Sequence, residues 1–528
     1  MRYKVTRLTT HPMKKLSCFV ASFLLLSVPL RGADQPQWGE RFSRNMVSEE
    51  TNLPDNWNAG RRDARTGEID LSTTQNVRWV APLGEVVLGT PVVAEGCVLV
   101  GSNGTQSKRP EFQGDRGVLT CLDEKTGKLL WELVIPKLTE IRYADWYNVG
   151  ISSVPIVSES KVYVMTNRGE VACLDLFGMK NGNQGPFLDE AKYAVDPEID
   201  PIELNDEDAD ILWLVDLVKE IGVQFHNATN CSFLLDGDLF YICTGNGTDW
   251  THRRVMNPIA PTLIVLDKNS GKVLAVDDFR LGPNIIHGQW SSPALGTVNG
   301  HKLIFQGTGS GHLFAVEALS EEAAEKARTT GKIAKLNTVW KFNGHPLAQT
   351  QEVVPLEFFH DTRSYEVIGN PVFQDNRIYV VFTQEMFHNI PDGWLACLDA
   401  TKTGDTTRNG GLVWAYDGIS SSSSTVAVAD GLVYIADGSG RLHCVDRDTG
   451  KPYWVAPLGS QVWGSPLIAD GKVYLGTSGR KCFIFRHGKE MELISQVTVP
   501  GRIQSSITAA NGTLFVPMHG AIYAVEKR

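Results

Sequence analysis

One repeated unit constrains the fold of this chain more than any other sequence feature. Residues 431–459 hold two alternating apolar strands joined by a Gly-Ser-Gly turn, followed by an Asp-x-x-Thr-Gly-Lys corner and a third strand that ends in Trp454. Residues 117–133 repeat the corner and the Trp at the same offsets. A third copy, residues 267–275, keeps the corner but has Ala275 in place of the Trp. The pattern predicts a β-meander repeated along the chain.

Each recurrent residue has a structural role in such a unit. The corner Gly supplies the positive φ that a tight turn needs, and the Asp and Thr side chains can bond the backbone of the turn. A Trp at the end of the unit can bury roughly 150–250 Å² between neighbouring sheets. We therefore expect the corner to be a scaffold element that stacks one sheet on the next.

The spacing of the repeat predicts eight units. Each unit closes its third strand at an acidic or equivalent position: Asp123, Asp175, Asp267, Glu317, Asp399, Asp446, Arg486 and Glu526. Each of these strands follows an innermost strand that starts with small residues, as in GTPVV, SSVPIV, NCSFLL, SSPALG, GNPVF, SSTVAV, GSPLIA and SSITAA. We expect small residues there because inner strands converge on an axis, where large side chains would collide.

The two ends of the chain complement each other. The eighth unit stops at Arg528 without its outer strand, while residues 79–84, WVAPLG, repeat residues 454–459 although no inner strands precede them. The chain is therefore predicted to be all-β, an eight-bladed β-propeller of four-stranded antiparallel blades closed by the N-terminal strand, which removes exposed sheet edges. An open solenoid is the competing architecture.

The N-terminus predicts export and three segments. Residues 13–33 combine a Lys pair, an apolar run and a small-residue exit, which is typical of a secretory signal. We expect a signal peptide at 1–33, with Met1 or Met13 as the start, an N-terminal extension at 34–75 and a single propeller domain at 76–528. Cys18 precedes the apolar run, so the sequence predicts a secreted or periplasmic protein without a lipid anchor.

Net charge and cysteine positions restrict the binding partners and the disulfide bonds that the chain can have. The formal net charge of the 528 residues is −10, and the absence of a dense basic stretch argues against nucleic acid as a partner. No later segment is long and apolar enough to span a bilayer. Cysteines two residues before the anchors are expected to be small core fillers, and a bond between Cys231 and Cys243 across one hairpin stays open.

Chemistry-capable residues gather on one predicted face. In a four-stranded blade, the linkers between blades and the loops between strands two and three open on the same face. That face is expected to hold residues 141–148, 222–230, 244–254, 285–290, 356–366, 384–394 and 461–463, which are rich in aromatic residues, His, Asn and Arg. Such convergence around a channel mouth predicts a ligand or partner site. The opposite face receives an acidic loop at 177–210 and a short exposed helix within 318–337.

The repeated corners resemble the PQQ-type repeat of quinoprotein alcohol dehydrogenases and of the bacterial outer-membrane assembly propeller lipoprotein. The resemblance covers nearly all of the mature chain. The stretches TNRGEVACLD, FHNATN, TGNGTDWTH and HGQWSSP also look like secreted planctomycete-type PQQ-repeat proteins.

The resemblance implies cofactor-binding positions. In quinoprotein dehydrogenases a segment similar to TGNGTDW supplies an Asn ligand to the calcium ion that holds the quinone, and Asn246 falls on that position. Trp250, His287, Gln289 and Trp290 are the implied neighbours of the cofactor pyrroloquinoline quinone (PQQ). The family's catalytic Asp falls within residues 287–291, which read HGQWS and contain no carboxylate. Substitutes for this missing general base are Asp145, Asp249 or Asp361.

Two functions follow as alternatives. The first is an extracytoplasmic binding or scaffold module that takes a small-molecule ligand or an envelope protein through its aromatic, His-rich face, with no assigned catalytic residue. The second is a PQQ- and Ca²⁺-dependent dehydrogenase of alcohols or sugars. A shared fold does not decide between them, but the missing Asp favours the first.

Overall fold

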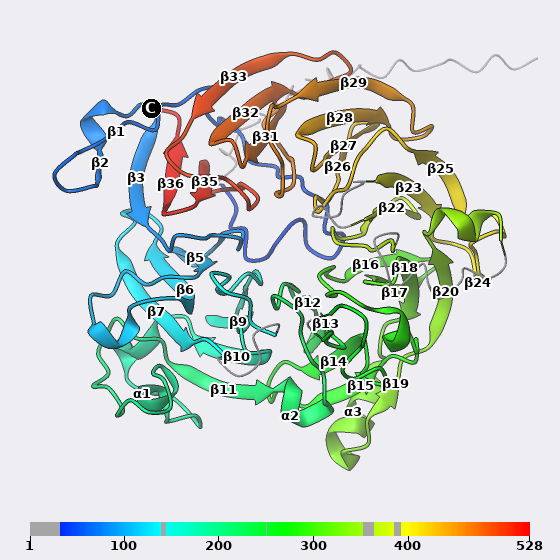
Figure 1. Cartoon of the computed structure of the whole chain (residues 1–528), viewed down its shortest axis with the longest axis horizontal. Helices are drawn as coiled ribbons and strands as arrows, with labels where there is room; N and C mark the ends of the chain where they lie inside the picture. Colours follow the sequence, from blue (N-terminus) through cyan, green and yellow to red (C-terminus); the bar gives the residue numbers. More distant parts are fainter. Residues whose placement is uncertain (1–31, 139–143, 250, 352–363, 385–391) are drawn as a thin grey trace, which may run out of the picture. The chain divides into compact units, whose positions relative to one another are not determined.

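Eight β-sheets radiate from a common axis in the computed structural model (Figure 1). The structure describes residues 32–138, 144–249, 251–351, 364–384 and 392–528, and Gly32–Arg528 form one compact unit. Blades are numbered here in chain order, and their strands are named from the axis outward. The predicted eight-bladed propeller is confirmed.

The first four blades contain the longer insertions. Blade 1 comprises β4 (Val92–Ala94), β5 (Cys97–Ser102), β6 (Arg116–Asp123) and β7 (Leu129–Pro136), and blade 2 comprises β8 (Ile156–Ser158), β9 (Lys161–Met165), β10 (Glu170–Asp175) and β11 (Ile211–Asp216). Blade 3 comprises β12 (Leu234–Asp236), β13 (Leu239–Cys243), β14 (Leu263–Asp267) and β15 (Val273–Val276), and blade 4 comprises β16 (Ala294–Val298), β17 (His301–Gly307), β18 (His312–Glu317) and β20 (Thr338–Asn343).

The remaining blades are more regular. Blade 5 comprises β21 (Val372–Gln374), β22 (Arg377–Thr383), β23 (Gly393–Asp399) and β25 (Leu412–Tyr416), and blade 6 comprises β26 (Ala427–Ala429), β27 (Leu432–Ala436), β28 (Arg441–Asp446) and β29 (Pro452–Pro457). Blade 7 comprises β30 (Leu467–Ala469), β31 (Lys472–Thr477), β32 (Lys481–Arg486) and β33 (Leu493–Thr498), and blade 8 comprises β34 (Thr508–Ala510), β35 (Thr513–Met518), β36 (Ala521–Glu526) and β3 (Val77–Pro82).

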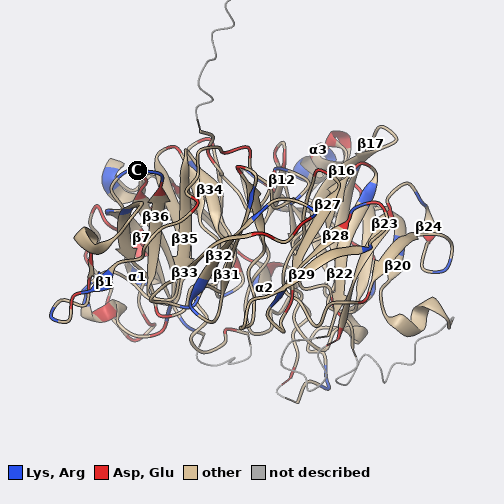
Figure 2. Ribbon diagram, turned by 90° about the horizontal axis from the view of Figure 1, so that it is seen from above, with Lys and Arg blue, Asp and Glu red and all other residues tan. Residues whose placement is uncertain are grey.

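Short elements decorate this frame. Two-residue strands β19 (Ala334–Lys335) and β24 (Gly404–Asp405) add in parallel to blades 3 and 4, so these sheets depart from the purely four-stranded antiparallel prediction. A small hairpin pairs β1 (Arg61–Arg62) with β2 (Ile69–Asp70). The helices are α1 (Glu190–Tyr193), α2 (Leu217–Ile221) and α3 (Glu321–Thr330), together with the 3₁₀ turns Leu71–Thr73, Pro110–Phe112, Gly178–Asn181, Gly282–Asn284 and Pro346–Gln349. Helix α3 is the predicted exposed helix and lies at one edge of the side view (Figure 2).

The N-terminal strand β3 closes the ring. It pairs antiparallel with β36, placing Trp79 opposite Ala524 and Pro82 opposite Ala521. This pairing supplies the outer strand that the eighth unit lacks in sequence, so the blade has the same strand order as its neighbours.

The repeated corners stack each blade on the next. In the blade 6 corner, Asp446 Oδ1 accepts hydrogen bonds from the backbone N–H and the hydroxyl of Thr449, at 2.9 and 2.8 Å. Gly450 has a φ of +70°, and the ring of Trp414 from blade 5 lies directly against its Cα. Trp414 Nε1 donates to the carbonyl of Arg447 at 2.9 Å. The Trp of one blade is therefore held by the corner of the following blade.

The same docking recurs around the ring. Four further outer-strand tryptophans donate Nε1–H to a backbone carbonyl of the following blade: Trp79 to Glu124, Trp131 to Leu176, Trp340 to Ala400 and Trp454 to Gly488.

A ring of hydrogen bonds joins the inner strands near the axis. At seven blade junctions, a backbone N–H just before one inner strand donates to a side-chain oxygen at the same position of the next blade. The seven bonds, of 2.6–3.2 Å, run from Val154 to Ser232, Ser232 to Ser292, Ser292 to Asn370, Asn370 to Thr425, Thr425 to Ser465, Ser465 to Ser506 and Ser506 to Thr90. The eighth junction differs because Val154 has no side-chain oxygen to accept from blade 1.

Residues 33–50, the N-terminal strap, cross the ring at its axis, where the dark blue chain passes in Figure 1. In six blades the N–H three residues beyond the ring of hydrogen bonds donates to the strap. These six donors are Val93, Val157, Leu295, Phe373, Val428 and Ile468. Arg44, fully buried, donates to the carbonyls of Ser232, Phe233 and Pro293, and burial lowers its pKa to about 10. The strap thus contacts the inner strands that the ring brings together.

Two further expectations concern cysteines and the acidic loop. The eight cysteines from Cys97 to Cys482 are buried free thiols. Cys231 and Cys243 are among them, so no disulfide joins this pair. In the loop at 177–210, the carboxylate of Asp208 forms an ion pair with Arg109 at 2.8 Å. The backbone of Asp208 also forms an isolated parallel β-bridge with Glu132 of blade 1. The loop therefore packs on the outer strand of the preceding blade.

We predict that Gly450→Ala destabilises the protein more than Gly471→Ala. Both glycines have positive φ, of +70° and +66°, so either Ala costs about 1–2 kcal/mol in the left-handed region. A Cβ on Gly450 would also lie 2.5 Å from the Trp414 ring, whereas nothing lies within 4 Å of a Cβ on Gly471. Overpacking adds about 1–3 kcal/mol at Gly450. Equilibrium denaturant unfolding measures the difference, and equal losses would contradict the docking role of this corner.

The ring of hydrogen bonds predicts opposite effects for two substitutions. Thr425→Val keeps the side-chain shape but leaves the buried N–H of Asn370 without its acceptor, which costs about 1–3 kcal/mol. Val154→Thr supplies a hydroxyl at the eighth junction and is expected to be neutral or to stabilise by up to about 1 kcal/mol. Thermal and denaturant unfolding of both variants test this pair. Equal destabilisation by both would show that packing at these positions outweighs the hydrogen bonds.

Candidate functional site

A cavity of about 1030 Å³ lies on the propeller axis. All eight blades contribute to its lining, and Trp38 of the strap contributes from the far end. Five of the segments that the sequence places on the active face line it: residues 146–148, 227–230, 251–253, 286–290 and 461–463. The segments 356–366 and 384–394 fall largely outside the described residues, and their described parts do not line the cavity.

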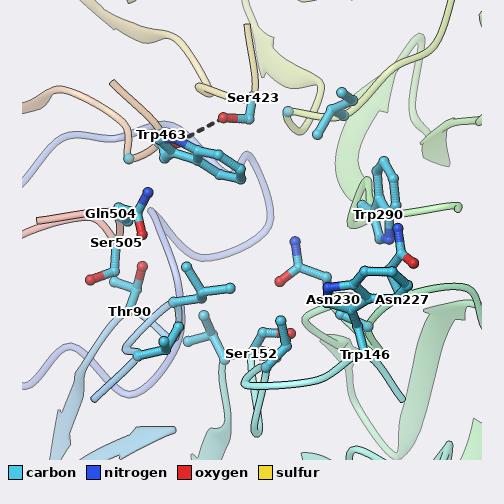
Figure 3. Close-up of a pocket in the computed structure, with 18 of the residues that line it drawn as sticks. Thr90, Trp146, Ser152, Asn227, Asn230, Trp290, Ser423, Trp463, Gln504 and Ser505 are labelled. Atoms are coloured by element: carbon cyan, nitrogen blue, oxygen red, sulfur yellow. Dashed lines mark hydrogen bonds between the residues drawn. The ribbon is translucent and has the colours of Figure 1, made fainter. Parts of the chain in front are cut away.

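Aromatic and small polar groups face each other across the cavity. Figure 3 shows Trp463 on one side of the space and Trp290 and Trp146 on the other. Around the same space lie the side chains of Thr90, Ser152, Asn227, Asn230, Ser423, Gln504 and Ser505. Hydroxyl and amide groups both donate and accept hydrogen bonds, so this lining suits a ligand with apolar faces and several polar groups.

The charged groups of the lining are basic. Arg253 and Arg502 line the cavity, together with the imidazoles of His252, His287 and His519, and the described part of the lining holds no Asp or Glu. Burial and the charge of Arg502 lower the pKa of His519. The cavity therefore favours neutral or anionic ligands over cationic ones.

Three histidines cluster at the cavity wall. His226, His252 and His287 each offer one ring nitrogen, and these nitrogens lie within 4.8 Å of one another. The Nε2 atoms of His226 and His252 are 3.1 Å apart, and the ring centroids of the three pairs lie 4.9–5.6 Å apart. Burial, with smaller contributions from the charges of His287 and His252, lowers the pKa of His226 to about 3. His226 is therefore a neutral imidazole at ordinary pH.

The local backbone positions each ring of this cluster. The carbonyl of His226 accepts from the N–H of Ala228 at 2.8 Å. His252 has a φ of +53°, in a turn where Asp249 Oδ1 accepts the backbone N–H groups of Arg253 and Arg254. His287 Nδ1 lies 3.5 Å from Glu366 Oε1. The three rings thus come from three separate loops of blades 2 to 4.

The structure separates the predicted cofactor-binding residues into two groups. His287 and Trp290 line the cavity, whereas Asn246 and Gln289 are buried and do not. Asn246 Oδ1 accepts from Gln289 Nε2 at 3.0 Å, and Asn246 Nδ2 donates to the carbonyls of Asn257 and Ala260. The Asn246 amide therefore holds the loop of blade 3 together, and the predicted metal role of Asn246 stays a prediction. Trp250 lies outside the described residues.

The two substitute bases that the structure describes occupy structural roles. Asp145 is buried, pairs with Lys137 and accepts from Asn167 Nδ2 at 2.7 Å, while burial raises its pKa. Asp249 caps the turn that carries His252. Asp361 lies outside the described residues.

Sequence reasoning missed two parts of the lining and the proximity of three histidines beside it. Trp38 lies in a segment without periodicity, and no local signal places it on the axis. Arg502 and Gln504 directly precede the small residues SSITAA, and this position before an inner strand is the signal that could have found them. The proximity of His226, His252 and His287 depends on how three loops fold back, which spacing does not reveal.

Known proteins share the repeat and the fold of this chain. A family model described as outer membrane protein assembly factor BamB matches residues 62–177, 111–217 and 391–486. The chain is a PQQ-type eight-bladed β-propeller. The structure of BamB from Moraxella catarrhalis matches this propeller with a TM-score of 0.51 at 14% identity, over 86% of this chain and 97% of that one.

An enzyme shares the same fold. A europium-containing methanol dehydrogenase matches the propeller with a TM-score of 0.56 at 12% identity, over 93% of this chain and 89% of that one. No curated protein matches the chain. At these identities the likeness establishes the fold alone, and the nearer resemblance to planctomycete-type proteins stays a prediction. Over the described residues, no helix is long and apolar enough to cross a membrane.

Proposed function

We propose that this propeller is an extracytoplasmic binding protein whose axial cavity takes a small hydroxyl-rich molecule, such as a saccharide or sugar acid. The cavity carries this proposal, because its tryptophans face a ring of hydroxyl and amide groups. The apolar face of a sugar packs on an indole while its hydroxyls exchange hydrogen bonds with Ser, Thr, Asn and Gln side chains. The secretory signal predicted at residues 1–33 supports a place outside the cytoplasm.

The strap supports a small ligand over a bulky partner. Trp38 lines the cavity at the strap, so an occupant enters from the face that carries the tryptophan loops. The volume of about 1030 Å³ is at the upper end for small-molecule sites. The family description names an assembly factor, which makes an envelope protein bound across the same face the competing occupant.

The quinoprotein alternative fits the residues less well. A calcium ion prefers carboxylate and carbonyl oxygens, yet Asn246 Oδ1 already accepts from Gln289, and the described lining has no carboxylate. Arg253 and Arg502 could receive the carboxylates of PQQ, which is the observation that keeps this alternative worth testing. We derive no catalytic step through the quinone.

Tryptophan fluorescence tests ligand binding directly, because four indoles line the cavity, those of Trp38, Trp146, Trp290 and Trp463. We expect at least one member of a panel of monosaccharides, disaccharides and sugar acids to change the emission saturably. Trp463→Ala should weaken its binding on the order of tenfold or more, which corresponds to about 1.4 kcal/mol. Tyr453→Ala, which removes an exposed aromatic ring from the outer strand β29, is the matched control and should leave binding unchanged. No saturable change at millimolar concentrations would contradict the proposal.

Titration with PQQ and Ca²⁺ tests the alternative. Because the amide oxygen of Asn246 is engaged inside the loop, we expect any PQQ binding to be independent of Ca²⁺, both in the wild type and in Asn246→Ala. Absorbance and calorimetry provide the readouts, and circular dichroism confirms that the variant folds. Tight calcium-dependent binding that Asn246→Ala abolishes would favour the quinoprotein and would justify an assay with an artificial electron acceptor.

A further inference from the structure

We propose that His226, His252 and His287 bind one transition-metal ion of the zinc class, with an open coordination position toward the axial cavity. Three imidazoles are a common protein ligand set for such ions, whereas Ca²⁺ and Mg²⁺ prefer oxygen donors. The site does not depend on the proposed sugar ligand, because a metal ion alone can test it.

The distances are close to those of a metal site. Zn–N bonds of about 2.0–2.1 Å in tetrahedral geometry place two ligand nitrogens roughly 3.3 Å apart. The Nε2 atoms of His226 and His252 are 3.1 Å apart, and the nitrogen offered by His287 lies within 4.8 Å of both. A small rotation of the His287 ring would complete a triangle of ligands. A hydrogen bond between His226 and His252 is the competing explanation of the short contact.

A carboxylate lies beside one of the three histidines, as is common around protein metal sites. A ligating histidine commonly contacts a carboxylate through its second ring nitrogen, which fixes the ring orientation. Glu366 Oε1 lies 3.5 Å from His287 Nδ1, so His287 Nε2 can face the ion. Glu366 is only 1% exposed, and its backbone N–H and C=O pair with Thr383 at 2.7 and 2.9 Å. Glu366 is therefore held beside the histidine as a positioning residue.

The open position follows from where the rings lie. His252 and His287 both line the axial cavity, whereas His226 is 2% exposed behind them. With three ligands from the described residues, the fourth tetrahedral position is the one we assign to water or to an oxygen of a bound molecule. Arg253, next to His252 on the cavity wall, favours an anionic oxygen at that position.

Titration of the mature, tag-free and chelator-treated protein with Co²⁺ and Zn²⁺ tests the site. We expect one Co²⁺ per chain, a visible absorption typical of low coordination number, and displacement by Zn²⁺. His252→Ala should weaken binding at least a hundredfold, since it removes one of three ligands from a half-buried loop. His287→Gln should do the same. His519→Ala removes a cavity imidazole outside the cluster and should leave stoichiometry and affinity unchanged.

The Glu366→Gln variant tests the positioning role, because loss of its charge should weaken Co²⁺ binding on the order of tenfold while the spectrum keeps its shape. Thermal unfolding of each variant shows whether it folds. If His287→Gln does not fold, the affinity of His252→Ala for Co²⁺ alone tests the site. Absence of saturable one-to-one binding, or equal binding by the wild type and His252→Ala, would overturn the proposal. Sugar binding measured in chelator stays a separate result, so either proposal can fail without the other.

Discussion

The hydrogen bonds between neighbouring inner strands are the constraint on which this propeller depends. Inner strands that converge on an axis cannot fill the space with large side chains, yet their buried N–H groups still need acceptors. Small hydroxyl and amide side chains solve both problems at seven junctions. The same requirement makes the wall of the axial cavity polar, because Thr90, Thr425 and Ser465 belong to the ring and also line the cavity. The side chains that join the inner strands are therefore also side chains that a ligand of the proposed kind would meet.

The strap changes what the axial space can do. A propeller channel open at both ends would exchange solvent freely, but the strap accepts hydrogen bonds from six inner strands three residues beyond the ring. Arg44 secures it to blades 3 and 4 through the carbonyls of Ser232, Phe233 and Pro293, and it also donates to the carbonyl of Trp38 within the strap. Trp38 of the strap then forms part of the cavity lining, so the strap shapes the cavity as well as joining the inner strands.

Much of the frame was predictable because its causes are local or periodic. The Asp-x-x-Thr-Gly-Lys corner bonds itself within four residues, and Trp79 finds its place because blade 8 lacks an outer strand. Small residues before each inner strand were predicted on steric grounds alone, whereas the structure adds a hydrogen-bonding reason that depends on registry between blades. Asn246 and Gln289, matched by resemblance, bond each other in the fold. The strap and the histidine cluster involve contacts between distant segments that no local pattern encodes.

The loops between blades carry chemistry that the frame does not determine. Blades 2 to 4 supply both the Asn246–Gln289 pair and the three histidines, but only His252 and His287 reach the cavity. The oxygen of a buried amide suits a hard cation, whereas the imidazoles of the proposed site suit a borderline ion. The Asp-Thr-Gly corners, the outer-strand tryptophans and the hydroxyls of the inner ring lie outside these loops. The proposed histidine site therefore lies in loops on which the propeller frame does not depend.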